Sequence, residues 1–139
     1  MAEKGIREKL MEKNLRVTPQ RIAVYEAVKQ LKFHPLAENI HEHVKKEHPN
    51  LALGTVYKIL DMLVENGLIR RVKTDKDHVR YDAITEKHHH LYCYESDRIE
   101  DYFDRELDEL INNYFQDKNI PGFTIKDVKL QLVGRFRKH

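Results

Sequence analysis

Hydrophobic residues recur at helical spacing through the first part of the chain. A charged segment from about Lys4 to Lys13 is expected to be helical. A second helix should begin at Thr18, a good N-cap, with Pro19 at the first helical position, and run to about Phe33. One apolar face of this helix is formed by Ile22, Tyr25, Val28 and Leu31.

Two more helices are expected before residue 68. The first runs from Ala37 to Glu47 with Ile40 and Val44 turned inward, and the segment 48–50 (His-Pro-Asn) ends it. The second covers residues 52–65, and Gly67 supplies a left-handed C-terminal cap. Its apolar stripe consists of Leu53, Val56, Leu60 and Leu63.

A change to alternating polarity follows these helices. Leu68–Lys73 and His78–Ala83 are predicted to be strands joined by the polar turn 74–77. Helices followed by a two-stranded hairpin predict a winged helix-turn-helix domain over residues 1–84, with the helix at 52–65 as recognition helix and the hairpin as wing.

The remaining residues, 85–139, show a different pattern after a short link at 85–87. His90–Tyr94 and Arg98–Tyr102 predict a hairpin, and the alternation in Phe123–Phe136 predicts a strand. Between them lies a helix with Leu107, Leu110, Ile111 and Tyr114 on one face. The fold class is therefore α+β, ending in a small β-α-β domain. Because so few residues bury only a small core, we expect a second copy to complete it, in a homodimer.

Composition narrows the function classes. The chain has 139 residues, 40% of them hydrophobic and 35% charged, and Cys93 is its only cysteine. No apolar run approaches the roughly 20 residues that cross a bilayer, and no signal peptide is recognisable, so we expect a cytoplasmic protein without membrane contact. Residues 1–84 carry 16 basic and 12 acidic side chains, against 9 and 11 in residues 85–139. This bias weakly favours a polyanionic partner for the first domain.

The predicted recognition helix offers groups that suit double-stranded DNA. Thr55 and Tyr57 could contact base edges, and Arg16, before the second helix, could enter a narrow minor groove. Contacts to the phosphate backbone are expected from Lys58, Arg70 and Arg71. The alternative is that Tyr57 belongs half to the core and that the cations form a solvated surface.

Histidines are the second candidate chemistry. Of the nine present, His88, His89 and His90 are consecutive, so on a strand the first and third share a face and the middle one points away. Asp82 and Asp101 are possible oxygen ligands, and His34 precedes a proline at the edge of the winged-helix domain. Such a set suits Fe(II), Mn(II), Zn(II) or Ni(II) without separating them. The alternative is a surface run of histidines; His41, His43, His48 and His78 are interpreted as surface or packing residues.

Four stretches carry a family resemblance. They are Arg16–Arg21 (RVTPQR), Gly54–Leu60 (GTVYKIL), Tyr81–Asp82 and His88–Cys93 (HHHLYC). Together they resemble the ferric uptake regulator family over nearly the whole chain, and within it the peroxide-responsive branch. The resemblance implies a repressor with a winged-helix DNA-binding domain, a dimerisation domain, and one regulatory divalent metal per subunit at the domain junction.

The resemblance also implies roles for particular residues. The regulatory ligands map by position to His34, Asp82, His88, His90 and Asp101. Asp101 stands where the iron-responsive branch usually has Glu, which favours peroxide sensing with Fe(II) or Mn(II). In that branch bound Fe(II) reacts with peroxide and oxidises ligand histidines, here His34 and His88, and the repressor leaves DNA. An iron- or zinc-responsive uptake regulator is the alternative within the family.

Two departures from the family pattern are visible. Most relatives hold a structural zinc with two Cys-x-x-Cys pairs, but here Cys93 stands alone and Ser96 fills the second position, so a four-cysteine zinc site is impossible. We therefore interpret Cys93 as a small buried hydrophobe. A further family metal site lacks its histidine near Val128, which leaves His89 and Asp108 as the candidates for a second ion.

Two interpretations belong to other classes of protein. A metalloenzyme would need an acid–base residue and an open coordination position, and the sequence contains no HExxH, nucleophile or phosphate-loop motif, so we predict that the protein is not an enzyme. A metal-free winged-helix interaction module, whose histidines only pack, is the other. Equilibrium dialysis with Fe(II), Mn(II) and Zn(II) would separate it from a metal-dependent regulator.

Overall fold

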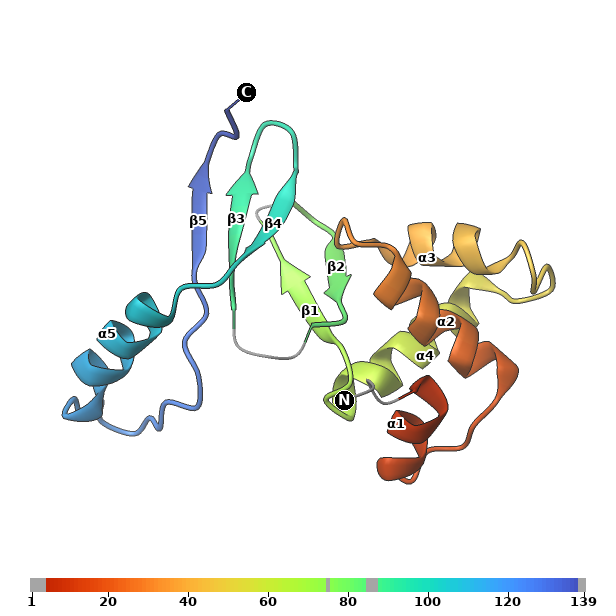
Figure 1. The fold of residues 1–139 in the computed structure, drawn as a ribbon, viewed down its shortest axis with the longest axis horizontal. Coiled ribbons are helices and arrows are strands. Elements are labelled where there is room, and N and C mark those ends of the chain that lie inside the picture. Colours follow the sequence, from red (N-terminus) through yellow and green to blue (C-terminus); the bar gives the residue numbers. More distant parts are fainter. Residues whose placement is uncertain (1–4, 75, 85–87, 138–139) are drawn as a thin grey trace. The chain divides into compact units, whose positions relative to one another are not determined.

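A computed structural model describes residues 5–74, 76–84 and 88–137. The chain divides into two compact units, Met1–Thr85 and Glu86–His139, which are described one at a time (Figure 1). Helices dominate the first unit and a sheet dominates the second, so the fold is α+β as predicted. The predicted link at 85–87, the first residue of the predicted first helix and Asp75 of the predicted turn lie outside the described residues.

The N-terminal unit contains the expected helices, α1 (Ile6–Glu12), α2 (Pro19–Gln30), α3 (Ala37–Val44) and α4 (Leu53–Glu65). The Thr18 side chain accepts a hydrogen bond from the backbone N–H of Arg21, which confirms the predicted N-cap of α2. Gly67 has φ +73°, the left-handed conformation expected just after α4.

Two of these helices end earlier than predicted. α2 stops at Gln30 rather than near Phe33, because Leu31 is already extended and the residue before Pro35 is disfavoured in a helix. α3 stops at Val44 rather than Glu47, since two successive backbone N–H groups, those of Glu47 and His48, donate to the Val44 carbonyl and tighten the last turn.

One hydrophobic core holds the N-terminal unit together. The apolar faces of α2, α3 and α4 pack against one another, and side chains from α1 and from the strands close the core. Its fully or nearly fully buried members include Leu10, Val24, Val28, Ile40, Val44, Val56, Leu60, Leu63, Ile69 and Tyr81. The predicted inward positions on α3 and α4 are confirmed, apart from Leu53, which is only partly buried.

The predicted wing is present and is fixed to the helices. β1 (Arg70–Lys73) pairs antiparallel with β2 (Val79–Asp82), with Arg71 opposite Tyr81. The backbone N–H of Tyr81 donates to the carbonyl of Pro35 at 2.9 Å, and Leu36 forms a single bridge with Arg80. The segment between α2 and α3 is therefore tied to the second strand of the wing.

The C-terminal unit is a three-stranded sheet with one helix. β3 (His89–Cys93) lies in the centre, antiparallel to β4 (Ile99–Tyr102) and parallel to β5 (Gln131–Gly134). α5 (Arg105–Gln116) is strongly amphipathic, yet none of its residues is buried. Figure 1 shows α5 beside one end of the sheet rather than across its face.

The last strand is shorter than predicted. The alternation in Phe123–Phe136 predicted one long strand, but only Gln131–Gly134 is a strand. Alternation of apolar and polar residues is not sufficient, because a strand also needs a neighbour. The five residues of β3 offer a parallel partner only along Gln131–Gly134.

Among the described helices, none is long and apolar enough to cross a membrane.

Candidate metal ligands and DNA-contact surface

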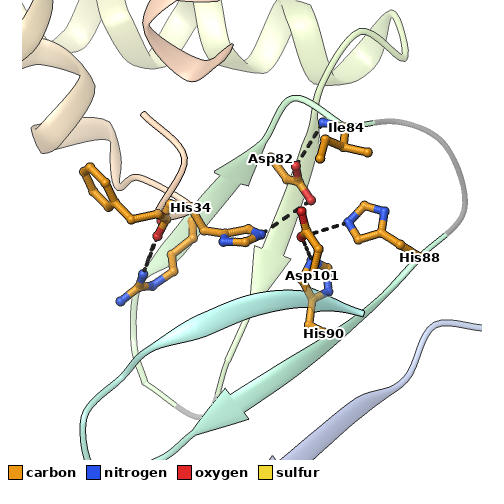
Figure 2. A network of polar contacts seen from close by, with 8 residues as sticks. His34, Asp82, Ile84, His88, His90 and Asp101 are labelled. Carbon is orange, nitrogen blue, oxygen red and sulfur yellow. Dashed lines mark hydrogen bonds and ion pairs between the residues drawn. The ribbon is translucent and has the colours of Figure 1, made fainter. Parts of the chain in front are cut away.

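Two of the predicted ligands meet inside the N-terminal unit. His34 lies between α2 and α3, and Asp82 is the last residue of β2. The His34 Nε2 and Asp82 Oδ2 atoms are 3.7 Å apart, and the side chains are only 5% and 6% exposed (Figure 2). The other carboxylate oxygen of Asp82 accepts a hydrogen bond from the backbone N–H of Ile84 at 2.9 Å. This bond holds Asp82 with one oxygen turned toward the imidazole.

The backbone around His34 is held in an unusual conformation. His34 has φ +58°, in the left-handed region that a non-glycine residue rarely adopts. The Arg80 guanidinium, on β2, donates to the carbonyl oxygens of Phe33 and His34 at 3.1 and 3.3 Å. Such backbone strain persists only where surrounding contacts fix it, and it is concentrated at functional positions. The wing therefore supplies Asp82 and also holds the loop that presents His34.

The other three predicted ligands meet inside the C-terminal unit. His88 Nε2 and His90 Nε2 lie 3.3 and 3.6 Å from the same oxygen, Oδ1 of Asp101 on β4 (Figure 2). The antiparallel register explains this, because His90 stands directly opposite Asp101. The two imidazole rings are 4.8 Å apart, so both lie on one face as the alternation predicted. His88 is buried, and His90 is 12% exposed.

His89 points to the other side and makes a different kind of contact. It is fully buried, and its Nδ1 accepts a hydrogen bond from the backbone N–H of Leu130 at 3.1 Å. The proton of the neutral ring is therefore on Nε2, which donates to Asp108 Oδ1 on α5 at 2.6 Å. Both ring nitrogens are used within the protein. Among the described residues, no third ligand group joins His89 and Asp108 in a metal-like cluster.

His41, His43 and Cys93 behave as structural residues. His41 Nε2 is 2.7 Å from the carbonyl oxygen of Leu51, and His43 Nε2 is 3.1 Å from Gln30 Oε1. Cys93 is buried and forms no disulfide, which agrees with its interpretation as a packing residue. Hydrogen bonds from Ser96, in the turn that follows, lower the pKa of the Cys93 thiol. In this chain the Cys-x-x-Ser pattern therefore makes a hydrogen-bonded turn.

Most of the predicted DNA-contact residues are exposed, whereas Arg70 on the wing is half-buried. The exposed ones are Arg16, Thr55, Tyr57, Lys58 and Arg71. Thr55 and Lys58 line a hollow of 740 Å³ between the start of α2 and the start of α4, together with Arg21. Tyr57 is 43% exposed, so the alternative that it belongs half to the core is not supported.

Sequence reasoning missed the partners of two residues in this region. The Tyr57 hydroxyl donates to Glu38 Oε1 on α3 at 2.8 Å. Arg71 Nη2, expected at phosphate, lies 2.6 Å from Asp61 Oδ1 on α4. No pattern in the sequence could have indicated the first contact, because its two residues are 19 positions apart and lie on different helices.

A winged-helix unit followed by a small sheet unit, with imidazole–carboxylate groups in both, is the architecture of a metal-responsive transcription regulator. Residues 12–133 match the model of the ferric uptake regulator family. The peroxide operon regulator of Bacillus subtilis is 30% identical over 127 residues, which cover 91% of this chain and 86% of that protein. The peroxide-responsive repressor PerR of Staphylococcus saprophyticus is 28% identical over 125 residues, which cover 90% and 82%.

Solved structures agree. The Campylobacter jejuni peroxide stress regulator is similar with a TM-score of 0.72 and 26% identity over 96% of this chain and 94% of that chain. The Pseudomonas aeruginosa ferric uptake regulator, determined with manganese, has a TM-score of 0.78 at 23% identity over 95% and 98%.

The chain therefore belongs to the ferric uptake regulator family. It is a metal-dependent transcriptional repressor of the peroxide-stress kind and not an enzyme, so the prediction from the sequence is confirmed and the metalloenzyme interpretation is wrong.

Proposed function

We propose that this protein is a homodimeric cytoplasmic repressor in which one divalent cation per subunit joins the two units and makes them competent for operator DNA. Its ligands are His34 and Asp82 from the N-terminal unit and His88, His90 and Asp101 from the C-terminal unit. The observation that carries the proposal is that the five residues form two incomplete ligand groups, one in each unit.

The distances within each group fit a shared ion. Metal–nitrogen and metal–oxygen bonds of about 2.0–2.2 Å place neighbouring ligand atoms roughly 3–3.5 Å apart. The ligand atoms here are separated by 3.3 to 3.7 Å within each group, slightly long for hydrogen bonds. Two ligands in one unit are too few to hold an ion firmly, and three in the other leave coordination positions to water, whereas together the two groups supply five protein ligands.

The donor chemistry limits the metal. Three imidazoles and two carboxylates suit Fe(II) or Mn(II), and Zn(II) or Ni(II) could also bind in vitro. With a single cysteine, the chain cannot form a four-cysteine structural zinc site. The manganese in the similar Pseudomonas aeruginosa structure supports Mn(II) as the redox-inactive probe.

Coupling to DNA follows from the position of the ligands. Because His34 and Asp82 are fixed to the winged-helix unit, a cation bound to both groups would hold the two recognition helices of a dimer at one spacing, about 34–36 Å for successive DNA turns. The cation would favour this arrangement only to the extent that it binds the linked form of the protein more tightly than the unlinked form. α4 would enter the major groove with Thr55 and Tyr57 at base edges, while Lys58 and Arg16 would contact the backbone and minor groove.

The peroxide response would use the same ligands. Bound Fe(II) would supply the reducing equivalent that converts peroxide into an oxidant beside the imidazoles. His34 and His88 are the residues that we expect to gain oxygen. An oxidised imidazole is a poorer ligand, so each damaged subunit would lose the link between its units and release the operator.

Dimerisation is supported by the surface of the C-terminal unit. Leu110 and Tyr114 on α5 are 64% and 58% exposed, and β5 lies at the edge of its sheet with every residue exposed. Exposed apolar surface and an open strand edge are features that a second copy would cover. Apolar packing and strand pairing would replace the structural zinc in holding the dimer.

The test begins with DNA selected from a random pool by the Mn(II)-loaded protein. Anisotropy titrations should show tight binding with Mn(II) or Fe(II) and weak binding after chelation. His90→Ala should abolish this metal dependence, and His43→Ala, which removes a half-buried histidine outside both ligand groups, should not. If His90→Ala keeps the operator affinity of the wild type both with metal and after chelation, the proposed site is contradicted.

Peroxide sensing is tested separately on the Fe(II)-loaded protein. Peroxide should release DNA and add oxygen to tryptic peptides containing His34 or His88, whereas the Mn(II) protein should stay bound. If DNA binding survives peroxide and no oxygen is found on either histidine, an iron- or zinc-responsive regulator becomes the better description.

A further inference from the structure

The exposed tyrosine of the recognition helix is tied to an acidic side chain of the neighbouring helix. Tyr57 lies in the second turn of α4, and its hydroxyl donates to Glu38 Oε1, in the first turn of α3, at 2.8 Å. Both side chains are exposed, so the contact is not a by-product of the core. α3 and α4 pack against each other through Ile40, Val44, Val56 and Leu60, and this packing fixes the separation of the two residues.

This hydrogen bond has a direction. A phenol has one proton, and a carboxylate can only accept, so the Tyr57 proton is committed to Glu38. The same hydrogen bond raises the pKa of Tyr57, which keeps the proton on the phenol at neutral pH. The lone pairs of the Tyr57 oxygen remain, and they can accept a hydrogen bond from a further group.

The direction matters in the major groove. Adenine presents an N6 amino donor there and cytosine an N4 amino donor, whereas guanine N7 and O6 and thymine O4 are acceptors. A tyrosine that is free to rotate its hydroxyl could pair with any of these edges. A tyrosine that can only accept will favour an amino group and disfavour an acceptor edge.

Resting on the proposed DNA-binding role of α4, we propose that Glu38 is a positioning residue that makes Tyr57 an acceptor-only reader of an adenine or cytosine amino group. Glu38 itself would touch no base. It acts by fixing the ring and by accepting the hydrogen bond that the Tyr57 hydroxyl donates.

The experiment uses the full-length Mn(II)-loaded protein and an operator selected by it from random DNA. Single adenines are replaced by 2′-deoxynebularine, which lacks the amino group, and single cytosines by 2-pyrimidinone deoxyriboside. For wild type, one substitution in each half-site should weaken binding by about tenfold. For Tyr57→Phe, which keeps the ring and loses the oxygen, that same substitution should have little effect.

Variants of Glu38 separate hydrogen bonding from charge. Glu38→Ala frees the phenol to donate, and an adenine without its amino group still presents the N7 acceptor, so the tenfold penalty at an adenine should fall to about twofold or less. Glu38→Gln removes the charge and keeps an acceptor oxygen, so it should retain most of the penalty. Circular dichroism and Mn(II) affinity should be unchanged in all three variants, which excludes misfolding as the cause.

The outcomes distinguish this inference from the proposed function. If the wild-type protein selects no sequence from the pool, the proposed DNA-reading role fails. If it selects an operator but Glu38→Ala keeps the full penalty at every position, or if Tyr57→Phe keeps it, the role given to Glu38 is wrong. A uniform change of affinity across all base substitutions would show a purely electrostatic role and would also overturn it.

Discussion

The two units of this protein differ in how much of their structure is completed within one chain. The N-terminal unit has a continuous core contributed by all four of its helices and by its hairpin. Among the described residues of the C-terminal unit, the buried hydrophobic side chains are Tyr92, Cys93 and Ile99, and the buried polar ones are His88 and His89. Nearly half of the small interior of the second unit is therefore imidazole.

Buried apolar side chains are concentrated in the N-terminal unit, whereas exposed ones are concentrated in the C-terminal unit. Most of those in the described chain belong to the C-terminal unit: Tyr94, Phe103, Leu110, Tyr114, Ile120, Phe123, Leu132 and Val133. A unit of this size gains little stability from its own core, and the proposed dimerisation would add to it by covering this apolar surface. The N-terminal unit thus contains its own core, and the C-terminal unit is the one in which the proposed dimer would cover apolar surface.

Leu60→Ala should produce the largest change, a loss of folding stability. Leu60 is 0% exposed in the middle of α4, so the substitution leaves a cavity and should lower the free energy of unfolding by about 2–5 kcal/mol. Urea denaturation followed by circular dichroism measures this. Leu110→Ala, the same change at a 64% exposed position of α5, is the matched control. A similar loss in both variants at low protein concentration would contradict the contrast between the units.

Leu110→Asp should act on association rather than on folding. A charge on the exposed apolar face of α5 should raise the dimer dissociation constant by about 30-fold or more, the effect of disrupting a well-packed interface contact. Sedimentation velocity over a dilution series gives this constant. Met11→Asp places the same charge at a 61% exposed position of the N-terminal unit and should leave it unchanged. A monomeric wild type, or equal effects of the two variants, would remove α5 from the interface.

The sequence predicted the structure of the N-terminal unit better than that of the C-terminal unit. In the N-terminal unit the apolar periodicity, the Thr18 cap and Gly67 predicted the helices, the hairpin and most of the core, because each signal is local. In the C-terminal unit the long strand over Phe123–Phe136 was wrong beyond Gln131–Gly134, since the length of a strand depends on a distant partner.

The candidate site shows the same limit. The alternation of His88 and His90 could be deduced from strand geometry, and the structure places both beside Asp101. The pairing of His34 with Asp82 came only from the family resemblance, since the loop, the strained backbone and the wing that bring them together are tertiary features. The Tyr57–Glu38 contact was missed for this reason too, because it depends on how two helices pack.

Substituting one ligand in each unit tests whether the two ligand groups share a cation. His34→Ala and His90→Ala should each weaken Mn(II) binding by at least about tenfold, and the double variant should be little worse than either single one, because removing either ligand already breaks the shared site. Calorimetric titration of the full-length protein measures the affinities, with His43→Ala as control. If His34→Ala binds Mn(II) like wild type, or if the two losses are fully additive in free energy, the groups act separately.

The smallest predicted effect is a difference in how acid changes the N-terminal caps of α2 and α5, one helix from each unit. α2 is capped by the neutral Thr18 hydroxyl, whereas α5 is capped by the Asp104 carboxylate, which accepts from the backbone N–H of Leu107 at 3.0 Å and from the Tyr102 hydroxyl at 2.7 Å. The Leu107 hydrogen bond, followed by that of Tyr102, lowers the pKa of Asp104 below its ordinary value of 3.8. A lowered pKa means that the ionised cap stabilises α5 above pH 3.8, and that this stabilisation is lost as pH falls below it.

Acidification should therefore fray the start of α5 before that of α2, a difference measurable from the exchange rates of the Leu107 and Arg21 amide protons. Asp104→Asn is the matched variant, because asparagine caps a helix about as well as aspartate but does not titrate in this range. The protection of its Leu107 amide, taken relative to an unfolded chain at the same pH, should no longer fall below pH 3.8 and should be near that of wild type at neutral pH. If the Leu107 amide still loses protection in acid in this variant, the Asp104 cap does not cause the effect. Other groups in the C-terminal unit, whose core is small, would then control the stability of α5.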